Sequence, residues 1–510
     1  MDNDNLKEAL KAYFGYGDFR SPQDEIIRSI LDKRDVIGIL PTGTGKSLCY
    51  QLPAVFLPDL TIVISPLVAL MKDQVDILTK RGIPATALNS HLTPKQMRER
   101  ITEILENRYK VIYLAPEKLF SEDFRDVFRE LPISHIAVDE AHCISQWGHD
   151  FRPKYKKIAQ ALETLPHKPV LSAFTATANE AVLEDIRSLL HLEDPILYKT
   201  TFDRPNLYMD MDLYGNKTSF IESYVAQHPN LGLVYCGTRA DAERIHGKLS
   251  KITTAGLYHA GLTKKERTQV QEEFFGDRYK VLVATNAFGM GLDKENISYI
   301  LHQSMPSSLE AYYQEIGRGG RNGEPCECIL LFGLKDVQVN RALGRERTYF
   351  RWRLKQKEDQ LREMIAFTHA RSCYRQIILE HFGETTSPCG HCGNCMAEWE
   401  ERDRSIPARK ILSAIYHTKG YYGKATQVAI LKGKRTAKVK ERHLDELTVF
   451  GVMKDQEERD IHLLLQELIL QGYLDQINEG LEERLLITAK GADLLKGETS
   501  LRLSERRWST

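Results

Sequence analysis

One glycine-rich segment constrains the fold of this chain more than any other feature. Residues 42–47 read TGTGKS, after an apolar stretch at 35–40 and before a stretch at 48–52 that can open a helix. A strand, a glycine-rich turn and a helix N-terminus form a phosphate-binding loop, because successive N–H groups face the anion and the helix dipole adds positive potential. The residues expected to hold the phosphates are Thr42, Gly43, Thr44, Gly45, Lys46 and Ser47.

The last two residues of this loop have separate expected roles. Lys46 can reach the outer phosphates of a nucleotide, and the Ser47 hydroxyl can ligate Mg²⁺. The full pattern expects a glycine where this chain has Leu40. Taken alone, the segment therefore also fits an ordinary glycine-rich loop.

An acidic pair follows another apolar segment. Asp139 and Glu140 come directly after residues 136–138, which read as the end of a buried strand. Facing the phosphate loop, Asp139 would hold Mg²⁺ through its water shell, and Glu140 would polarise the water that attacks the terminal phosphorus. A solvated cap at a strand end is the alternative interpretation.

A third motif, far downstream, supplies positive charge. Residues 314–321 read QEIGRGGR, and Gln314 is included with the arginines as a candidate catalytic residue. Arg318 and Arg321 are three residues apart and can both reach one phosphate group from the side opposite the lysine, as arginine fingers do. An isolated pair of this spacing is more often part of a solvated surface, but the glycines here leave room for close approach.

Together these motifs resemble those of superfamily 2 helicases, and more narrowly of the RecQ family of DNA helicases, over roughly residues 6–497. The matching segments are 19–23, 42–47, 65–67, 114–117, 139–142, 175–178, 284–291 and 314–321. The resemblance implies an ATP-dependent DNA helicase that moves 3′ to 5′ along one strand and acts in DNA repair or recombination. Gly319 and Asn322 depart from the family pattern, which usually has alanine and aspartate there.

The same resemblance implies how the nucleoside is held. Gln23 would hydrogen-bond the edge of the adenine base, and Phe19 or Arg20 would flank its ring. Asp293 would bridge to the sugar or to the arginines. The expected cofactors are therefore ATP and Mg²⁺, joined by Zn²⁺ as described below.

The order of apolar and helical segments predicts the architecture. Short β-branched runs alternate with helical stretches up to about residue 333, which favours parallel α/β sheets. The predicted class is α/β, with two tandem RecA-like parallel-sheet lobes, then a helical zinc-binding subdomain and a winged-helix domain. The expected domains are 1–200 (the ATP-binding lobe), 201–335 (the second lobe), 336–404 (the helical hairpin and zinc-binding subdomain), 405–498 (the winged helix) and 499–510 (a disordered tail).

Individual elements are predicted in the same way. The expected strands of the two lobes are 35–40, 61–65, 110–114, 135–139, 170–174, 232–235, 254–258, 280–284, 299–301 and 328–332. The expected elements of the winged helix are helices 409–416, 425–431, 441–450 and 461–471 and a hairpin of 473–477 with 484–488. Such a domain can read a groove with one helix or separate bases with its hairpin. A protein-interaction module is the alternative.

Four cysteines are spaced as metal ligands. Cys389, Cys392 and Cys395 are each separated by two residues and flanked by glycines, and Cys373 precedes them on a helical segment. Four thiolates suit a closed tetrahedral Zn²⁺ site, and the RecQ resemblance implies the same ligands. An iron–sulfur cluster is the rival, although that spacing usually includes a further cysteine three residues on. His391 lies between two ligands and is expected to point away.

The loop directly after the acidic pair is rich in aromatic residues. Exposed aromatic side chains stack on bases without demanding a sequence, and the RecQ resemblance implies that this loop couples DNA binding to hydrolysis. Burial of its aromatic residues in the core is the alternative. The candidate nucleic-acid contacts are Ser145, Gln146, Trp147, His149, Phe151, Arg152, Thr175, Arg239 and Thr285.

Composition limits the partners and the compartment. Basic and acidic residues both number 70, so the net charge is zero and DNA binding must depend on local patches. One basic stripe, which fits a solvated surface equally well, consists of Lys432, Lys434, Arg435, Lys438 and Lys440. The N-terminus shows no secretory signal, and no stretch has the roughly 18 apolar residues of a membrane span. The 9 cysteines fit a reducing, cytoplasmic compartment.

The expected partners are single-stranded DNA and forked or tailed double-stranded DNA, with a single-strand-binding protein as a candidate protein partner. A monomer is favoured. Two other functions stay open: an RNA helicase, and a nucleic-acid-stimulated ATPase that remodels complexes without unwinding.

The aromatic loop generates a direct test. Replacing Trp147 by alanine is expected to leave basal ATP hydrolysis near the parental rate and to flatten its stimulation by single-stranded DNA, because a stacking contact typically contributes about 1–3 kcal/mol per base. Hydrolysis rates measured over a titration of single-stranded DNA check this. Parental stimulation in the variant would remove the loop from the coupling mechanism.

Overall fold

The computed structural model describes residues 3–41, 43–66, 68–90, 92–145, 152, 154–212, 216–288, 294–346, 351–479 and 482–507. The chain divides into two compact units, Met1–Cys395 and Met396–Thr510. Each has its own apolar core and is described by itself. Among the described residues, no helix has both the length and the apolar character that crossing a membrane requires.

The first lobe is built on a parallel sheet of seven strands in the order β3-β4-β2-β5-β6-β1-β7. Its strands are β1 (Val36–Ile39), β2 (Leu60–Ile64), β3 (Ala85–Leu88), β4 (Val111–Leu114), β5 (Ile133–Val138), β6 (Val170–Thr175) and β7 (Ile196–Lys199). The strands β1, β2, β4 and β6 are buried along their whole length. Helices cover both faces of such a sheet, which explains why these strands are almost continuously apolar.

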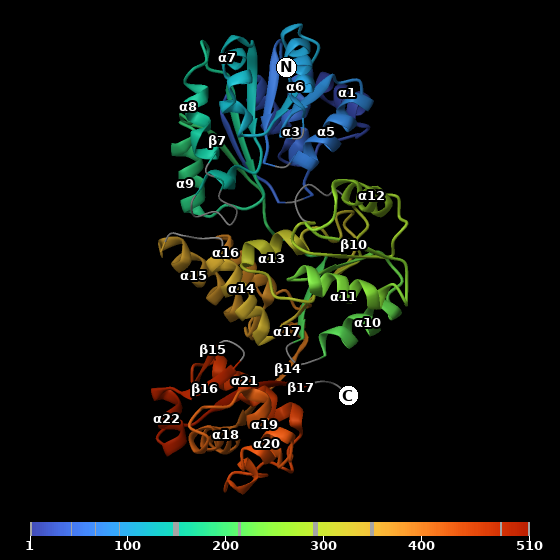
Figure 1. The fold of residues 1–510 in the computed structure, drawn as a ribbon. Helices are drawn as coiled ribbons and strands as arrows, with labels where there is room; N and C mark the ends of the chain where they lie inside the picture. The colour runs from blue at the N-terminus through green and yellow to red at the C-terminus, as the bar shows by residue number, and fades with distance from the viewer. Residues whose placement is uncertain are drawn as a thin grey trace. The chain divides into compact units, whose positions relative to one another are not determined.

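The helices of this lobe flank its sheet on two sides (Figure 1). They are α1 (Asn3–Ala9), η1 (Leu10–Phe14), α2 (Gln23–Leu31), α3 (Lys46–Gln51), α4 (Pro53–Phe56), α5 (Val68–Lys80), α6 (Pro94–Leu105), η2 (Lys118–Phe120), α7 (Glu122–Glu130), η3 (Ala141–Ile144), η4 (Tyr155–Lys157), α8 (Ile158–Leu162) and α9 (Glu180–Leu189). Helix α2 buries Ile26, Ile27 and Ile30, which repeat at helical spacing, in the core of the lobe.

The second lobe has a parallel sheet of six strands in the order β10-β11-β9-β12-β13-β8. Its strands are β8 (Leu207–Asp212), β9 (Gly232–Tyr235), β10 (Ala255–Tyr258), β11 (Val281–Ala284), β12 (Tyr299–His302) and β13 (Cys326–Leu331). Its helices are α10 (Lys217–Gln227), α11 (Arg239–Leu249), α12 (Lys264–Phe275) and α13 (Leu309–Ile316). A Cβ atom at Gly232 would lie 1.9 Å from the Tyr299 ring, so only glycine fits where β9 passes that side chain.

Each strand predicted for the two lobes overlaps an observed one, whereas β3, β7 and β8 were missed. The missed strands carry weak signals. Strand β7 alternates between half-buried and exposed positions at the edge of its sheet, and β8 alternates apolar residues with polar ones. Edge strands need no continuous apolar run, because one side has no neighbouring strand.

A helical region completes the first unit. Its helices are α14 (Leu334–Glu346), α15 (Arg351–Thr368), α16 (Tyr374–His381) and α17 (Gly393–Met396). Helix α15 contacts both α14 and α13, and α16 contacts α13 and β8. The cysteine-bearing region is therefore packed on the second lobe.

The second unit combines helices with a two-stranded hairpin. Its elements are β14 (Glu398–Asp403), α18 (Ser405–His417), α19 (Lys424–Lys432), α20 (Ala437–Glu441), η5 (Leu444–Glu446), α21 (Glu458–Leu470), β15 (Leu474–Glu479), β16 (Glu482–Ile487), α22 (Ala489–Lys496) and β17 (Arg502–Arg507). Apolar faces of α18, α19 and α21 form its core. Strands β15 and β16 form the predicted hairpin, and the arrangement is that of a winged helix.

Two expectations for this unit are wrong. The helix expected at 441–450 is absent, because His443 takes a left-handed conformation (φ 54°) and ends the helical run after α20. The tail expected to be disordered from 499 contains β17, which pairs with β14 in an antiparallel sheet. Strand β14 thereby joins the second unit, although residues up to 404 were assigned to the zinc-binding subdomain.

This pairing predicts that the end of the chain stabilises the second unit. Leu503 is 4% exposed within the core of that unit, so Leu503→Ala is expected to lower its unfolding free energy by about 2–4 kcal/mol. Arg502→Ala, at an exposed position of the same strand, is expected to change it by at most about 0.5 kcal/mol. Urea unfolding of the full chain measures both; equal stabilities would show that β17 contributes little.

Candidate nucleotide and metal sites

The phosphate loop forms the predicted strand–turn–helix. Strand β1 leads into it, and Gly45, with φ 82°, precedes α3, which begins at Lys46. Gly43 has φ 87°, a conformation that favours glycine. The Lys46 ammonium donates to the carbonyl of Leu40 at 3.1 Å. Leu40, which stands where the motif expects a glycine, therefore contacts Lys46 through its backbone, and its side chain is not needed for that contact.

The side chains predicted to read the adenine base lie against this loop. The Gln23 amide donates to the carbonyls of Thr44 (2.9 Å) and Gly45 (3.3 Å) and accepts from the backbone N–H of Arg20 at 2.9 Å. The Arg20 guanidinium donates to the carbonyl of Gly43 at 3.1 Å. Phe19 packs beside the core of the lobe. Gln23 and Arg20 thus link the predicted base site to the phosphate loop.

The acidic pair and the lysine share one electrostatic environment. Burial lowers the pKa of Lys46, and the charges of Glu140 and Asp139 oppose that change. Burial, followed by the charge of Glu140, raises the pKa of Asp139 to about 7. A carboxylate in such surroundings gains from a bound divalent cation, because the cation compensates both the lost hydration and the neighbouring charge.

A chain of polar contacts leads from the acidic pair to the next strand. The Nδ1 atom of His142 lies 3.4 Å from a Glu140 carboxylate oxygen and 3.0 Å from the Thr175 hydroxyl oxygen. The Thr175 hydroxyl donates to the carbonyl of Thr177 at 2.9 Å. The sequence interpretation assigned no role to His142; its place two residues after Glu140 in the matched motif was the available signal.

Two predicted DNA contacts do not fit this geometry. Thr175 and Ser145 are both fully buried. The Thr175 hydroxyl is engaged as just described, and the Ser145 hydroxyl donates to the Asp185 carboxylate at 2.7 Å. From the sequence alone both hydroxyls were predicted to contact DNA, because the packing of other elements, which the sequence does not reveal, buries them.

The predicted arginines are carried by a glycine-rich turn after α13. Arg318 is 5% exposed, and its Nε and Nη1 atoms have no hydrogen-bond partner among the described residues. A buried guanidinium with free donors matches an anionic ligand. Gln314 is half-buried on α13, four residues before Arg318.

Arg321 lies beside the phosphate loop. A Cβ atom built on Gly43 would be 3.1 Å from the Arg321 Cγ atom, and the Arg321 charge contributes to lowering the pKa of Lys46. Residues 43 and 321 belong to different lobes, so both lobes supply cationic side chains to one site. The expected convergence of Lys46, the acidic pair and this arginine is observed.

Of the remaining predicted residues, three have a described position and six lie outside the described part of the chain. Arg152 is half-buried and donates to the carbonyl of Pro66 at 3.0 Å. Arg239 is exposed at the start of α11, and Thr285 is buried and accepts from the backbone N–H of Ala287 at 3.4 Å. The predicted residues that lie outside the described ones are Thr42, Gln146, Trp147, His149, Phe151 and Asp293.

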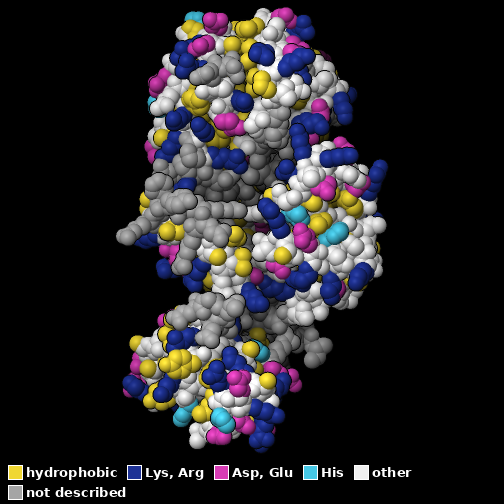
Figure 2. Space-filling model, viewed as in Figure 1, with side chains coloured by type: hydrophobic (Ala, Val, Ile, Leu, Met, Phe, Trp, Pro, Cys, Tyr) yellow, Lys and Arg dark blue, Asp and Glu magenta, His cyan; other side chains and the backbone are white. Residues whose placement is uncertain are grey.

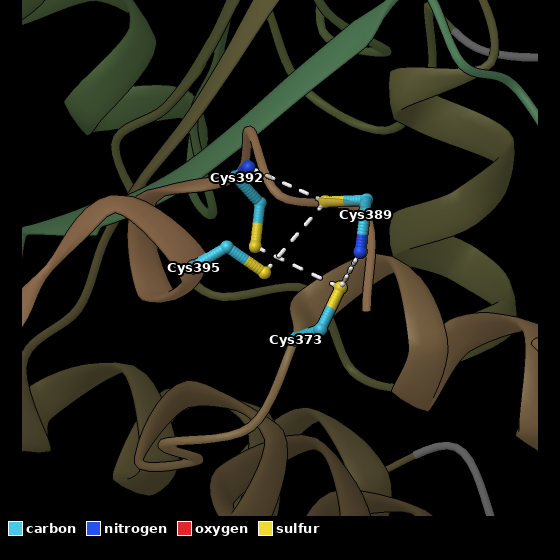
Figure 3. Close-up of side chains that lie close together, drawn as sticks. All are labelled: Cys373, Cys389, Cys392 and Cys395. Atoms are coloured by element: carbon cyan, nitrogen blue, oxygen red, sulfur yellow. Dashed lines mark hydrogen bonds between the residues drawn. The ribbon is translucent and has the colours of Figure 1, made fainter. Parts of the chain in front are cut away.

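The four predicted metal ligands converge. The sulfur atoms of Cys373, Cys389, Cys392 and Cys395 all lie within 4.8 Å of one another (Figure 3). Two pairs, Cys389 with Cys395 and Cys373 with Cys392, are 3.9 Å apart. Zn–S bonds of about 2.3 Å in a tetrahedron place sulfurs about 3.8 Å apart. An iron–sulfur cluster needs wider spacing, since irons and sulfides lie between the thiolates.

The surroundings support the same assignment. Backbone N–H groups of Cys389 and Cys392 donate to the sulfurs of Cys373 (3.2 Å) and Cys389 (3.3 Å), as thiolates favour. The Nδ1 atom of His391 lies 3.1 Å from the Cys389 carbonyl oxygen, and this ring is outside the convergent set, as expected. These four residues fit Zn²⁺ with no ligand position left for water, so the site is structural.

The basic stripe of the second unit is partly neutralised, since two of its five cations pair with acids. Lys434 pairs with Glu458, and Arg435 with Asp445 at 3.2 Å. Lys432 donates to the carbonyls of residues 454 and 456. On the face shown in Figure 2, Lys and Arg side chains are interspersed with Asp and Glu rather than gathered into one area.

The cysteine cluster leads to a prediction about the zinc content of variants. Cys392→Ser is expected to lower the zinc content from about one ion per chain to a small fraction and to lower the unfolding temperature, because a closed site needs all four thiolates. Cys236→Ser, at a buried cysteine outside the cluster, is expected to keep its zinc. Metal analysis of the purified variants checks this; full zinc content in Cys392→Ser would contradict the ligand set.

Four families match successive parts of the chain. They are the DEAD/DEAH box helicase family at residues 20–186, the helicase conserved C-terminal domain at 216–323, the RecQ zinc-binding family at 334–396 and the RQC domain at 398–509. The first match contains the phosphate loop and the acidic pair, the second contains the two arginines, and the third contains the four cysteines.

The chain is 41% identical to an ATP-dependent DNA helicase RecQ of Bacillus subtilis, over 97% of this chain and 84% of that protein. It is 39% identical to a putative ATP-dependent RNA helicase R290 of Acanthamoeba polyphaga mimivirus, over 76% of this chain and 72% of that protein. The solved structure of the Mycobacterium smegmatis helicase Lhr, bound to single-stranded DNA and AMP-PNP, has the same fold at 17% identity, with a TM-score of 0.55 over 95% of this chain and 60% of that one.

The site holds the groups that ATP and Mg²⁺ require, and the cysteine cluster holds those that Zn²⁺ requires. Together with the extent of the first similarity, these features identify an ATP-dependent DNA helicase: the chain belongs to the RecQ family.

Proposed function

We propose that this chain moves 3′ to 5′ along single-stranded DNA, uses each ATP hydrolysed to advance, and unwinds forked or tailed duplexes during DNA repair or recombination. The proposed location is the cytoplasm, where the DNA of its bacterial relatives lies. A monomer would suffice, because one chain carries both halves of the nucleotide site.

One observation carries the proposal. Arg321 of the second lobe lies against Gly43 of the first, and its charge acts on Lys46. A triphosphate bound at the loop would therefore contact cationic groups from both lobes, and its hydrolysis would change how strongly the lobes are held together. Such a change is what a translocating motor needs.

Each polar residue then has a role. Lys46 and Ser47 would hold the phosphates and Mg²⁺, with Asp139 on the metal's water shell and Glu140 on the attacking water. Arg318 and Arg321 would stabilise the charge that develops on the transferred phosphoryl group. Gln23 would leave the phosphate loop partly or wholly to meet the adenine edge, with Phe19 and Arg20 beside the ring.

The polar chain at His142 offers a route between ATP and DNA. It begins at Glu140 and ends at Thr175, which is buried and would transmit a shift rather than touch the strand. The aromatic loop begins three residues after Glu140, and Arg152 and Arg239 would contact DNA phosphates. Gln314 would support the arginines, and Asp293 the nucleotide sugar. The winged helix would hold the duplex ahead of the fork, with a single-strand-binding protein as a further partner.

An RNA helicase is the second candidate function. It is favoured by one observation, the similarity to a relative whose name specifies RNA. The longer match to a DNA helicase, which includes the cysteine cluster and the winged helix, favours DNA. An ATPase that remodels complexes without unwinding is the remaining alternative.

The proposal is tested by strand displacement with ATP on duplexes that carry a 3′ or a 5′ tail, built from DNA or RNA. Displacement is expected only for DNA with a 3′ tail. Lys46→Ala is expected to lower ATP turnover by at least about a thousandfold while single-stranded DNA still binds, because the main phosphate ligand is lost. Binding is followed by fluorescence anisotropy.

The other outcomes separate the rivals. Preference for a 5′ tail would overturn the polarity, and displacement of RNA duplexes would favour the RNA helicase. DNA-stimulated hydrolysis without any displacement would favour the remodelling ATPase. Arg187→Ala, at an exposed position of helix α9, serves as the control and is expected to behave as the parent.

A further inference from the structure

The segment between the two lobes, residues 200–206, lies against the turn that carries Arg318 and Arg321. Strand β7 ends at Lys199 and β8 begins at Leu207, so this linker is seven residues of irregular backbone. Irregular backbone is expected to be mobile unless side chains tie it down. Here several side-chain contacts fasten it, and two of its side chains point to the arginine-bearing turn.

Arg204 makes the central contact. Its guanidinium donates to the carbonyls of Gly319 (2.8 Å), Gly320 (3.1 Å) and Gly317 (3.4 Å). Gly317 caps the C-terminus of α13, where carbonyl groups lack helical partners and the helix dipole is negative. A planar, permanently charged fork bridges several such acceptors in a fixed geometry, which a lysine ammonium on its flexible stem does not reproduce.

Asn206 completes the attachment. Its amide donates to the carbonyls of Gly320 and Glu324, both at 2.8 Å. Gly320 has φ 55°, and a Cβ atom there would lie 2.4 Å from the Asn206 Nδ2 atom. The backbone on both sides of Arg318 and just before Arg321 is thus bound to the linker.

The other end of the linker is fixed to the cysteine-bearing region. The Glu384 carboxylate accepts from the Thr201 hydroxyl (2.7 Å) and from the backbone N–H of Phe202 (2.8 Å). The Phe202 ring stacks on Phe382 with centroids 4.3 Å apart. Asp203, next to Arg204, accepts hydrogen bonds from the guanidinium of Arg375 on α16.

The linker therefore cannot shift at Arg204 without breaking contacts on both sides. The arginine-bearing turn contains three glycines, 317, 319 and 320, and has little intrinsic rigidity. Its guanidinium groups can act on a phosphate only if the turn holds them within a fraction of an ångström of their place. From outside the turn, the side-chain contacts of Arg204 and Asn206 act together with a backbone hydrogen bond from Gly320 to the Ile297 carbonyl (2.9 Å).

We propose that Arg204 is a positioning residue for ATP hydrolysis, which holds the turn of Arg318 and Arg321 in its active geometry and ties it to the linker between the lobes. Arg204 does not touch the nucleotide in this proposal. The inference rests on the proposed function of the two arginines, and its test separates the two claims.

The test compares Arg204→Lys, Arg204→Ala and Asn206→Ala by the kcat and KM of ATP hydrolysis stimulated by single-stranded DNA. For Arg204→Lys, kcat is expected to fall about ten- to a hundredfold, since a small misplacement of catalytic groups costs that much. The KM for ATP, the Kd for single-stranded DNA, the zinc content and the unfolding temperature are expected to stay near parental values. Arg278→Lys, at an exposed arginine of the same lobe, is the matched control.

A double-variant cycle measures whether the effects of the Arg204 and Arg318 substitutions on kcat depend on each other, which a merely structural role of Arg204 would not produce. If Arg204 acts through Arg318, then Arg204→Lys is expected to lower kcat far less in an Arg318→Lys background than in the parent. Independent, multiplicative losses would overturn the proposal. So would a kcat within about twofold of the parent in folded Arg204→Lys, or a joint fall of kcat, DNA affinity and unfolding temperature in all three variants.

Arg318→Lys alone distinguishes the two levels of inference. If it keeps parental turnover, the proposed role of the arginines is wrong, and the role of Arg204 falls with it. If it loses turnover and Arg204→Lys does not, the proposed function stands and only the positioning role is overturned.

Discussion

The burial of charged groups at the nucleotide site is the constraint on which the rest of this structure depends. Lys46 is buried next to the positive charge of Arg321, and Asp139 is buried next to the negative charge of Glu140. Burial deprives these groups of water and the like charges add to that cost, although Glu140 and Asp139 each act on Lys46 more strongly than Arg321 does. A polyanion with a divalent cation relieves both, because the phosphates face the cationic groups and the metal faces the carboxylates.

The surrounding architecture keeps these groups in place at the ends of regular elements. The phosphate loop and acidic pair follow strand ends of one buried sheet, and α13 delivers the arginine-bearing turn from the other lobe. The linker is bonded to that turn on one side and to the cysteine-bearing region on the other, and so holds the turn in place. One departure from the family pattern also becomes clear: a Cβ atom at Gly319 would lie 2.2 Å from the Cys326 sulfur, so glycine at one position accommodates cysteine at the other.

Much of the fold and of the site was predictable, for identifiable reasons. Buried parallel strands are apolar along their length, so β1, β2, β4 and β6 were visible, whereas the edge strand β7 was not. The metal site was predictable because four cysteines at that spacing are typical of metal ligands. The errors share another cause. The hydroxyls of Ser145 and Thr175 are buried by elements that are distant in the sequence, so their local sequence does not show that burial. Strand β17 forms only by pairing with β14, which lies about one hundred residues earlier in the chain.

The sequence by itself determined the available chemistry: a phosphate-loop motif, acidic and guanidinium groups at set spacings, and four cysteines spaced as zinc ligands. These are local properties, because residue type and short spacing limit what a segment can bind. Only the tertiary structure decided that Arg321 reaches the loop of Lys46, that His142 joins Glu140 to Thr175, and that Arg204 holds the arginine-bearing turn. Such contacts join residues more than 30 positions apart, and in two cases more than 100, and no local pattern encodes a pairing that only the packing of whole lobes creates.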